Sequence, residues 1–213
     1  MAESIKIGAT RLQSVLKCPL CFWLSKRIGS APSIFPGIPA QIDSVIKNYM
    51  KQFIGSDNLP KWFPVRGTFI DASKTLRAID SVTDITVVGK LDALAKTKDG
   101  NYHILDYKTG KPRDEVPDYY QMQLDGYAYL LERNGYRPVS EGVLLYFTPE
   151  QGDILEDSFP FRITAVGTKV DSSRIPLVLA RAKEILELST PPLRSEDCAM
   201  CMWLEQVGQT FSK

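Results

Sequence analysis

The stretch GKLDALAKTKDGNYHILDYKTG, residues 89–110, decides the fold of this chain. Two strand-like runs flank a short turn sequence that contains Asp-Gly, and this arrangement predicts an antiparallel β-hairpin. Side chains of a strand alternate between the two faces of a sheet, so Asp106 and Lys108 share one face and Tyr107 lies on the other. An acid and an ammonium group therefore point the same way at the end of the second strand.

The length of the hairpin loop decides whether a second acid, Asp92, reaches this face. A two-residue loop would place Asp92 opposite Tyr107, on the wrong face. A three-residue loop flanked by Thr97 and Asn101, or a five-residue loop, would place Asp92 opposite Asp106, with the Cβ atoms roughly 5 Å apart. We predict a loop of odd length or an equivalent bulge.

Two carboxylates that meet on a half-buried face repel each other unless one is protonated or a cation neutralises them. A hard divalent ion such as Mg²⁺ suits a site of two carboxylates, a backbone carbonyl (that of Tyr107) and water. Lys108 could then orient or deprotonate a water, or stabilise charge on a phosphate, as in metal-assisted phosphodiester hydrolysis. The alternative is an ordinary solvated face, where an acid and a lysine two residues apart are common.

A strong helix is predicted from about Tyr119 to Asn134, and Gly135 ends it. Gln123 and Tyr127 lie one turn apart and share a face of this helix. That face could meet a phosphate or the reacting water at the sheet edge. The alternative is that Tyr127 belongs to the core and Gln123 to the surface.

The remaining pattern predicts a mixed β-sheet flanked by helices, which is an α/β fold. We expect one domain over residues 1–213, with a core at about 40–190. Further helices are predicted at about 10–20 (interrupted by Pro19), 40–53 and 172–188, and further strands at 65–71, 84–97, 102–109, 141–148 and 158–164.

Composition excludes several classes of protein. Lys and Arg number 26 against 25 Asp and Glu, so the chain is neither a strongly basic nucleic-acid coat nor an acidic tail. It is compatible with a nucleic-acid enzyme whose basic groove is local. No apolar run approaches the ~18 residues of a membrane span, and the first residues lack the apolar stretch of a signal peptide. We therefore expect a cytoplasmic protein with reduced thiols and no membrane partner.

All four cysteines occur in two pairs, Cys18-Pro-Leu-Cys21 and Cys198-Ala-Met-Cys201. Each pair can chelate a tetrahedral ion or part of a cluster, and a shared site would join the terminal segments 10–28 and 195–207. Thiolate ligands suit zinc or iron–sulfur chemistry rather than magnesium. The alternatives are two independent redox dithiols, four buried thiols, or disulfides.

Taken together, GKLDAL, LDYKTG and QLDGY resemble the PD-(D/E)XK nuclease superfamily, and specifically its RecB-like branch. That branch includes CRISPR-associated RecB-like exonucleases and AddB-type helicase-nucleases. Asp92 matches the first metal-binding acid, Asp106-Tyr107-Lys108 matches the acid-x-Lys signature, and Gln123 to Tyr127 matches the Gln-x-x-x-Tyr motif.

This resemblance implies a restriction-endonuclease-like core and a Mg²⁺- or Mn²⁺-dependent DNA nuclease. The expected activity is that of an exonuclease acting on single-stranded DNA or duplex ends. Partner proteins in a DNA repair or CRISPR-type complex are also implied. The alternative is a catalytically inactive nucleic-acid-binding or assembly module on the same fold.

The sequence departs from the branch at two points. Members carry a metal-binding His on an early helix, but the one His here, His103, lies on the face opposite Asp106, so Asp43 is the candidate replacement ligand. Branch members with a [4Fe-4S] cluster use one early and three late cysteines, whereas this chain has two and two. We favour the cluster at Cys18, Cys21, Cys198 and Cys201, with Zn²⁺ as the alternative.

Overall fold

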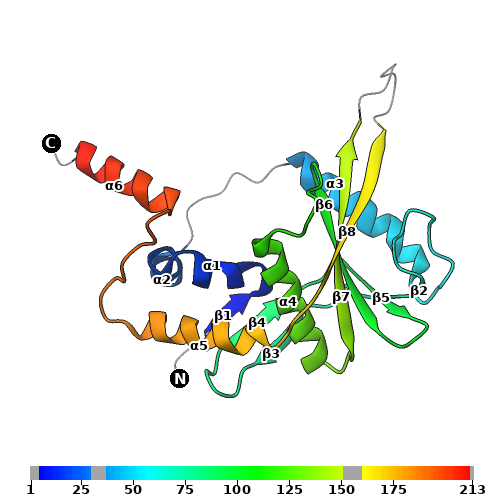
Figure 1. The fold of residues 1–213 in the computed structure, drawn as a ribbon, viewed down its shortest axis with the longest axis horizontal. Helices are drawn as coiled ribbons and strands as arrows, with labels where there is room; N and C mark the ends of the chain where they lie inside the picture. Colours follow the sequence, from blue (N-terminus) through cyan, green and yellow to red (C-terminus); the bar gives the residue numbers. More distant parts are fainter. Residues whose placement is uncertain (1–4, 30–36, 151–159, 212–213) are drawn as a thin grey trace.

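The computed structural model describes residues 5–29, 37–150 and 160–211, which form two β-sheets flanked by helices (Figure 1). The α-helices are α1 (Leu12–Lys17), α2 (Pro19–Arg27), α3 (Gly37–Met50), α4 (Asp118–Arg133), α5 (Arg174–Glu187) and α6 (Ala199–Phe211). Two 3-10 turns, η1 (Ala9–Arg11) and η2 (Lys51–Phe53), precede α1 and follow α3. Among the described residues, no helix has both the length and the apolar character needed to cross a membrane.

The strands divide into a five-stranded and a three-stranded sheet. They are β1 (Lys6–Gly8), β2 (Gly67–Ile70), β3 (Leu76–Ile79), β4 (Thr86–Gly89), β5 (Ala93–Thr97), β6 (Tyr102–Thr109), β7 (Val139–Pro149) and β8 (Phe161–Lys169). The larger sheet has the order β2-β5-β6-β7-β8, in which β6 and β7 are parallel and the other neighbours antiparallel. Helix α4 provides the crossover between the parallel strands, and the predicted mixed α/β fold is confirmed.

The single strand predicted over 84–97 is wrong, because the chain forms two strands there that belong to different sheets. Strand β4 pairs with β1 and β3, whereas β5 pairs with β2 and β6. The linker between them is 90–92, so Asp92 lies between the sheets rather than within a strand. Fourteen residues are more than most strands in globular proteins contain, and this run divides where Gly89, Lys90 and Asp92 are residue types that strands disfavour.

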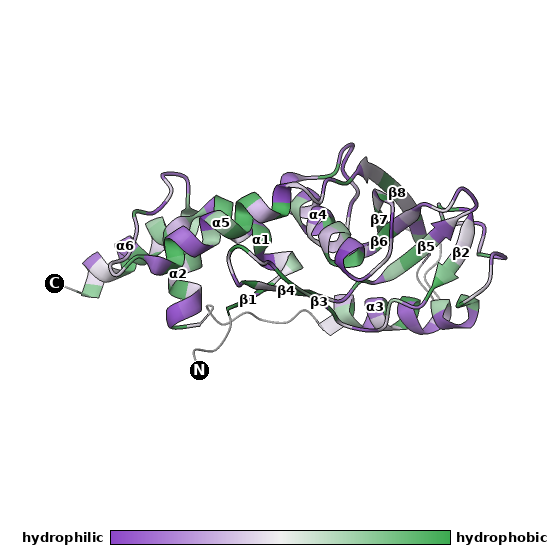
Figure 2. Ribbon diagram, turned by 90° about the horizontal axis from the view of Figure 1, so that it is seen from below, coloured by the Kyte–Doolittle hydropathy of each residue, from purple (hydrophilic) through white to green (hydrophobic). Residues whose placement is uncertain are grey.

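Two hydrophobic cores lie on opposite faces of the five-stranded sheet. Leu94 and Ile104 are buried on the face covered by α4, together with residues of α1 and α5. Leu105 is buried on the other face against Ile46 and Met50 of α3. Figure 2 shows α4 and α3 on the two sides of this sheet. The alternation predicted for β6 is therefore confirmed, and its polar end residues lie between the two covering helices.

The terminal segments differ in part from the prediction. The first helix is interrupted at Cys18, which is extended, and Pro19 begins α2, as its fixed φ favours. Helix α6 and the short strands β1 and β3 were not predicted. Of the predicted strand 158–164, residues 158 and 159 lie outside the described part of the chain.

Candidate active site and cysteine cluster

The β5–β6 hairpin closes through a three-residue loop, as predicted. Thr97 N–H donates to the Asn101 carbonyl at 2.9 Å, and Gly100 N–H donates to the Thr97 carbonyl at 3.0 Å. Gly100 has φ +89°, which glycine adopts without strain. The turn chemistry of residues 98–100 thus sets an odd loop length and, with it, the register of the two strands.

This register brings Asp92 to the position opposite Asp106. Ala93 pairs with Leu105, and continuing the register by one residue pairs Asp92 with Asp106. Although Asp92 lies on the linker, its Oδ2 accepts the backbone N–H of Tyr107 at 2.8 Å. The side chain of Asp92 is therefore held against β6, beside the acid that β6 carries.

Asp106 is almost completely buried, with 2% of its surface exposed. Its Oδ1 accepts a hydrogen bond from Gln123 Nε2 at 2.6 Å, and its Oδ2 forms an ion pair with the Lys108 ammonium. Burial raises the pKa of Asp106 to about 6, although Lys108 opposes the shift. A buried carboxylate needs a cation beside it, and hard divalent ions prefer oxygen ligands, so the oxygen that the Lys108 ammonium contacts is also the one that fits a metal ligand.

Gln123 and Tyr127 connect the two segments that carry the acids. Gln123 Nε2, which binds Asp106, also lies 3.3 Å from the Tyr127 hydroxyl, and that hydroxyl donates to the Lys90 carbonyl at 3.2 Å. A Cβ atom at Gly89 would lie 3.0 Å from the Tyr127 ring, so glycine permits the close packing of β4 on α4. Both motif side chains are buried, and they contact Asp106 and the linker before Asp92.

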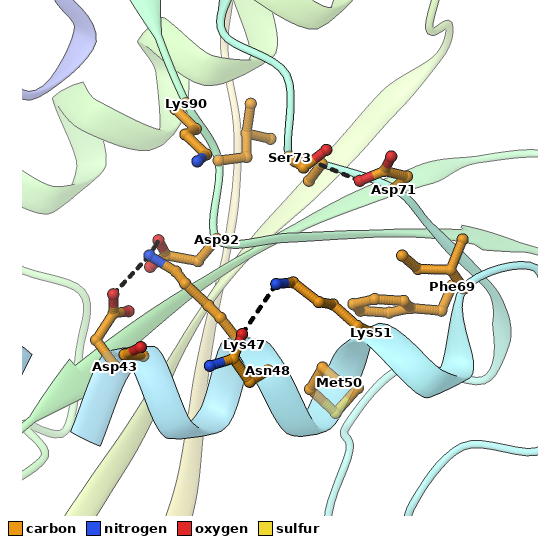
Figure 3. Close-up of a pocket in the computed structure, with 14 residues that line it drawn as sticks. Asp43, Lys47, Asn48, Met50, Lys51, Phe69, Asp71, Ser73, Lys90 and Asp92 are labelled. Carbon is orange, nitrogen blue, oxygen red and sulfur yellow. Dashed lines mark hydrogen bonds and ion pairs between the residues drawn. The ribbon is translucent and has the colours of Figure 1, made fainter. Parts of the chain in front are cut away.

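A residue that the sequence reasoning missed, Lys47, lies between Asp92 and Asp43 (Figure 3). Its Nζ is 2.7 Å from Asp92 Oδ1 and 2.7 Å from Asp43 Oδ2. Burial lowers the pKa of Lys47, but the hydrogen bonds to Asp43 and Asp92 outweigh burial and raise it above its ordinary value. The i,i+4 spacing of Asp43 and Lys47 on α3 was the one sequence signal for this contact.

The three candidate carboxylates are each held in place by a lysine rather than gathered around one point. Within the described residues, the four cysteines are the sole group of three or more metal-ligating side chains whose ligand atoms lie within 4.8 Å of one another. Asp43, Asp92 and Asp106 do not form such a group. Lys47 neutralises Asp92 and Asp43, and Lys108 neutralises Asp106. The repulsion expected between the acids is thus offset by two ammonium groups.

Two cavities meet at Asp43; they border Asp43, Asp92 and Lys108, whereas Asp106 lines neither of them. One, of about 320 Å³, is lined by residues that include Lys47 and Asp92. The other, of about 350 Å³, is lined by residues that include Lys108 and Tyr120, whose ring lies 4.2 Å from the Lys108 ammonium. The side chains singled out on β6, α3 and the linker therefore border solvent-accessible space, where a substrate could reach them.

His103 lies away from the acids, as predicted. Its Nε2 is 3.2 Å from Ser140 Oγ, and its Nδ1 is 3.4 Å from a carboxylate oxygen of Glu141, both on β7. The side chain of Tyr107 is likewise buried in the core on the α3 side. The Tyr107 carbonyl as a metal ligand stays a prediction.

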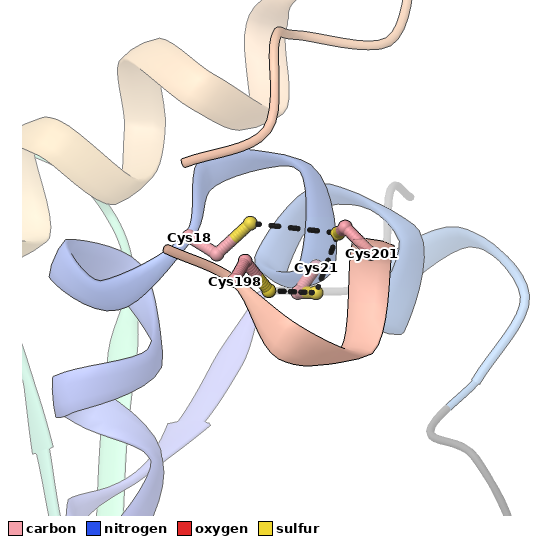
Figure 4. A group of neighbouring side chains, drawn as sticks. All are labelled: Cys18, Cys21, Cys198 and Cys201. Carbon is pink, nitrogen blue, oxygen red and sulfur yellow. Dashed lines mark hydrogen bonds between the residues drawn. The ribbon is translucent and has the colours of Figure 1, made fainter. Parts of the chain in front are cut away.

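The four cysteines form one cluster that joins the two ends of the chain (Figure 4). The sulfur atoms of Cys21 and Cys201 are 3.3 Å apart, those of Cys21 and Cys198 are 3.6 Å apart, and those of Cys18 and Cys201 are 3.8 Å apart. Four thiolates at about 2.3 Å from one tetrahedral zinc ion would be spaced by roughly 3.8 Å. The cluster therefore fits a single ion.

Each cysteine pair lies at the start of a helix, where backbone N–H groups favour negative charge. Cys18 is the residue before α2, and Cys198 is the residue before α6. Burial raises the pKa of Cys18, but hydrogen bonds from the backbone of Cys21 and Ser195 outweigh burial and lower this pKa to about 7. Burial raises the pKa of Cys201 to about 11. The group can thus supply thiolate at neutral pH, and a bound cation would deprotonate the rest.

Comparison with solved structures finds chains that are similar to this one. The solved structure titled "Crystal structure of SSO0001" has a TM-score of 0.50 at 18% identity, over 90% of this chain and 81% of that chain. An alkaline exonuclease (LHK-Exo) from Laribacter hongkongensis gives 0.44 at 11% identity, and its complex with dAMP gives 0.46 at 13%, each over 97% of this chain and 94% of the other. No curated protein matches the sequence.

A family model decides the classification. The model described as the PD-(D/E)XK nuclease superfamily matches residues 60–206, which is more than half of the chain. The matched region includes the hairpin, α4 and the parallel strand pair described above. The chain therefore belongs to the PD-(D/E)XK nuclease superfamily.

Proposed function

We propose that this protein is a divalent-metal-dependent DNA nuclease of the RecB-like branch. It would hydrolyse phosphodiester bonds as an exonuclease on single-stranded DNA or duplex ends. The observation that carries this proposal is the state of Asp106, whose carboxylate is buried and forms an ion pair with Lys108, the lysine of the acid-x-Lys pattern. Membership of a nuclease superfamily and the position of Asp92 opposite Asp106 support it.

Asp92 and Asp106 would hold Mg²⁺ or Mn²⁺, with Asp43 and the Tyr107 carbonyl as further ligands. When bound, such an ion supplies Lewis-acid stabilisation of phosphate charge and lowers the pKa of a bound water. Lys108 lies at the rim of a cavity with its ammonium on Asp106, so it can orient water or stabilise the pentavalent phosphorus transition state.

Gln123 and Tyr127 act in this proposal as positioning residues. Gln123 orients the Asp106 carboxylate, and Tyr127 holds the linker through the Lys90 carbonyl. The sequence predicts that these two side chains meet a phosphate or the reacting water, whereas here they act on Asp106 and on the linker. It follows from their burial, which leaves 7% of Gln123 and 4% of Tyr127 exposed.

The test of nuclease activity uses end-labelled linear single-stranded DNA, duplex DNA and circular single-stranded DNA with Mn²⁺. We expect degradation of linear substrates, an intact circle, and at least about a hundredfold loss of rate in Lys108→Ala. The matched control is Lys111→Ala, an exposed lysine three residues further on, which should keep its activity. DNA binding without cleavage of any substrate would instead indicate the inactive module.

The four-cysteine site would hold a single structural zinc ion. The sulfur spacing supports this choice over the [4Fe-4S] cluster favoured by the sequence reasoning. In such a cluster each thiolate binds a different iron, so the sulfurs must lie farther apart than around one ion. Elemental analysis and an absorption spectrum after anaerobic purification test the choice. Colourless protein with one zinc per chain is expected, and iron with a broad visible band would contradict it.

A further inference from the structure

The ammonium group of Lys47 occupies the oxygen of Asp92 that remains open to a metal. Asp92 Oδ2 accepts the Tyr107 N–H at 2.8 Å, and Oδ1 lies 2.7 Å from Lys47 Nζ. The same Nζ lies 2.7 Å from Asp43 Oδ2. One cation thus binds both an acid of the hairpin linker and the acid of α3 that is the candidate replacement for the missing histidine.

A divalent ion and this ammonium group would compete for the same oxygen. We infer that Lys47 is a resident counter-cation of the metal-free site, and that the divalent ion displaces its ammonium group from Asp92 on binding. This inference rests on the proposed metal-dependent function. It assigns a role to a lysine outside the acid-x-Lys signature.

The surroundings of Lys47 permit this exchange. Its side chain is 34% exposed, and it lines the cavity of about 320 Å³ beside Asp92, so the ammonium group has room to move away (Figure 3). Lysine carries its charge on a flexible four-carbon stem, which suits a group that changes partners. Lys108 holds Asp106 from the other side, so Lys47 neutralises the second acid until an ion replaces it.

We expect Lys47 to stabilise the metal-free site by neutralising Asp43 and Asp92, and for the same reason to weaken the affinity of the site for a metal ion. Without Lys47, Asp43 and Asp92 would face each other without a counter-charge, which favours a divalent ion more strongly. The loss of two partly exposed ion pairs corresponds to roughly a tenfold gain in Mn²⁺ affinity.

The test is Mn²⁺ binding, measured by electron paramagnetic resonance of the unbound ion, on the full chain with its cysteine-bound metal retained. Lys47→Met should bind Mn²⁺ about tenfold more tightly than the original chain. Lys47→Gln, whose amide can still donate one hydrogen bond, provides a second variant if Lys47→Met does not fold. The matched control is Lys51→Met, because Lys51 lines the same cavity but pairs with Asn48, at 2.9 Å, and should leave the affinity unchanged.

The outcomes separate this inference from the proposed function. Unchanged or weaker Mn²⁺ binding in both Lys47 variants would overturn the role of Lys47, while Mn²⁺-dependent DNA cleavage by the original chain would leave the nuclease proposal standing. No Mn²⁺ binding by any of the proteins would overturn both. Tighter binding that the Lys51 control also shows would mean a general charge effect and would overturn the specific exchange.

Discussion

The Asp92 carboxylate accepts the backbone N–H of Tyr107 at 2.8 Å, across the gap between the linker and strand β6. This bond extends the hairpin by one residue beyond its last strand pair, Ala93 with Leu105. The position of Asp92 relative to Asp106 therefore depends on strand register, and the register depends on the three-residue loop. A local turn thus determines the geometry of a site at the far end of the hairpin.

Replacing Gln123 by leucine should weaken the site through Asp106. The substitution removes the donor to Asp106 Oδ1, which would leave a buried carboxylate without its 2.6 Å hydrogen bond. We expect a loss of about 1–3 kcal/mol in unfolding free energy and a lower Mn²⁺ affinity, measured by urea denaturation and by Mn²⁺ titration. Tyr127→Phe is the milder comparison, because it removes the contacts of the hydroxyl with the Lys90 carbonyl and with Gln123 but leaves the bond between Gln123 and Asp106. Equal affinity in Gln123→Leu and the original chain would contradict this role.

The raised pKa of Asp106 predicts a pH dependence of stability in protein freed of divalent ions. Burial raises this pKa to about 6, above the value of about 3.9 for an exposed aspartate. The folded state thus binds a proton that the unfolded state has released, so the contribution is largest below about pH 4 and is lost as the pH rises through 6. The upper limit of this change is about 3 kcal/mol.

Urea unfolding at pH 4.5 and pH 7 measures this effect, with Asp106→Asn as the matched variant. The original chain should lose more stability between these two pH values than the variant does. Parallel losses in the two proteins would show that Asp106 is already ionised in the folded state at the lower pH.

Loss of the cysteine-bound metal should release helix α6 while α2 stays in place. Cys201 is the one buried residue of α6, whereas α2 is also held by Trp23 and Arg27, which donate to carbonyls at the end of α5. Trypsin cleavage after Arg194, whose Nε lies 2.7 Å from Glu205 of α6, should become faster in Cys201→Ser.

The control for this release is Glu205→Gln, which weakens the exposed ion pair of Arg194 but keeps all four thiols. It should change the cleavage rate little, because exposed ion pairs contribute about 0–1 kcal/mol. Equal rates in Cys201→Ser and the original chain would show that α6 is held by something other than the metal.

Replacing Asp125 should lower the stability of the fold without lowering its metal affinity, although Asp125 lies within the same QLDGY motif as Gln123. It is fully buried, and its carboxylate accepts the Arg174 guanidinium at 2.8 Å and the Asp171 N–H at 2.9 Å. Asp125→Asn should cost about 1–3 kcal/mol in urea unfolding, because it weakens the hydrogen bonds of a buried carboxylate, while the Arg174 side chain that loses its partner is 46% exposed and remains solvated. A weaker Mn²⁺ affinity in the folded variant would contradict a purely structural role.

The parts of the site that local chemistry determines could be predicted from the sequence. The Asp-Gly sequence located the hairpin turn, the odd loop length was predicted because only it places Asp92 opposite Asp106, and the alternation along β6 predicted the faces of Asp106 and Lys108. The break at residues 90–92 could not be predicted, because it depends on how closely β4 packs on α4 around Gly89. Gly89, Lys90 and Asp92 are residue types that strands disfavour, but these preferences alone do not show that the two halves join different sheets.

Contacts between distant segments were the other limit. The Lys47 contact with Asp92 joins residues that are 45 positions apart, and only the Asp43 partner lies at helical spacing. The contact between the two cysteine pairs is also a contact between distant segments, but it could be predicted. Both pairs have the same Cys-x-x-Cys spacing, which indicates a shared metal site without knowledge of the fold.

The central claim is that Asp92 and Asp106 bind one divalent ion between them. The most direct measurement is the anomalous scattering of Mn²⁺ in crystals of the full chain soaked with MnCl₂. We expect one strong peak about 2–2.5 Å from an oxygen of each carboxylate, with the Lys47 ammonium moved off Asp92. A Mn²⁺ peak that touches only one of these acids, or no peak near either, would contradict the claim.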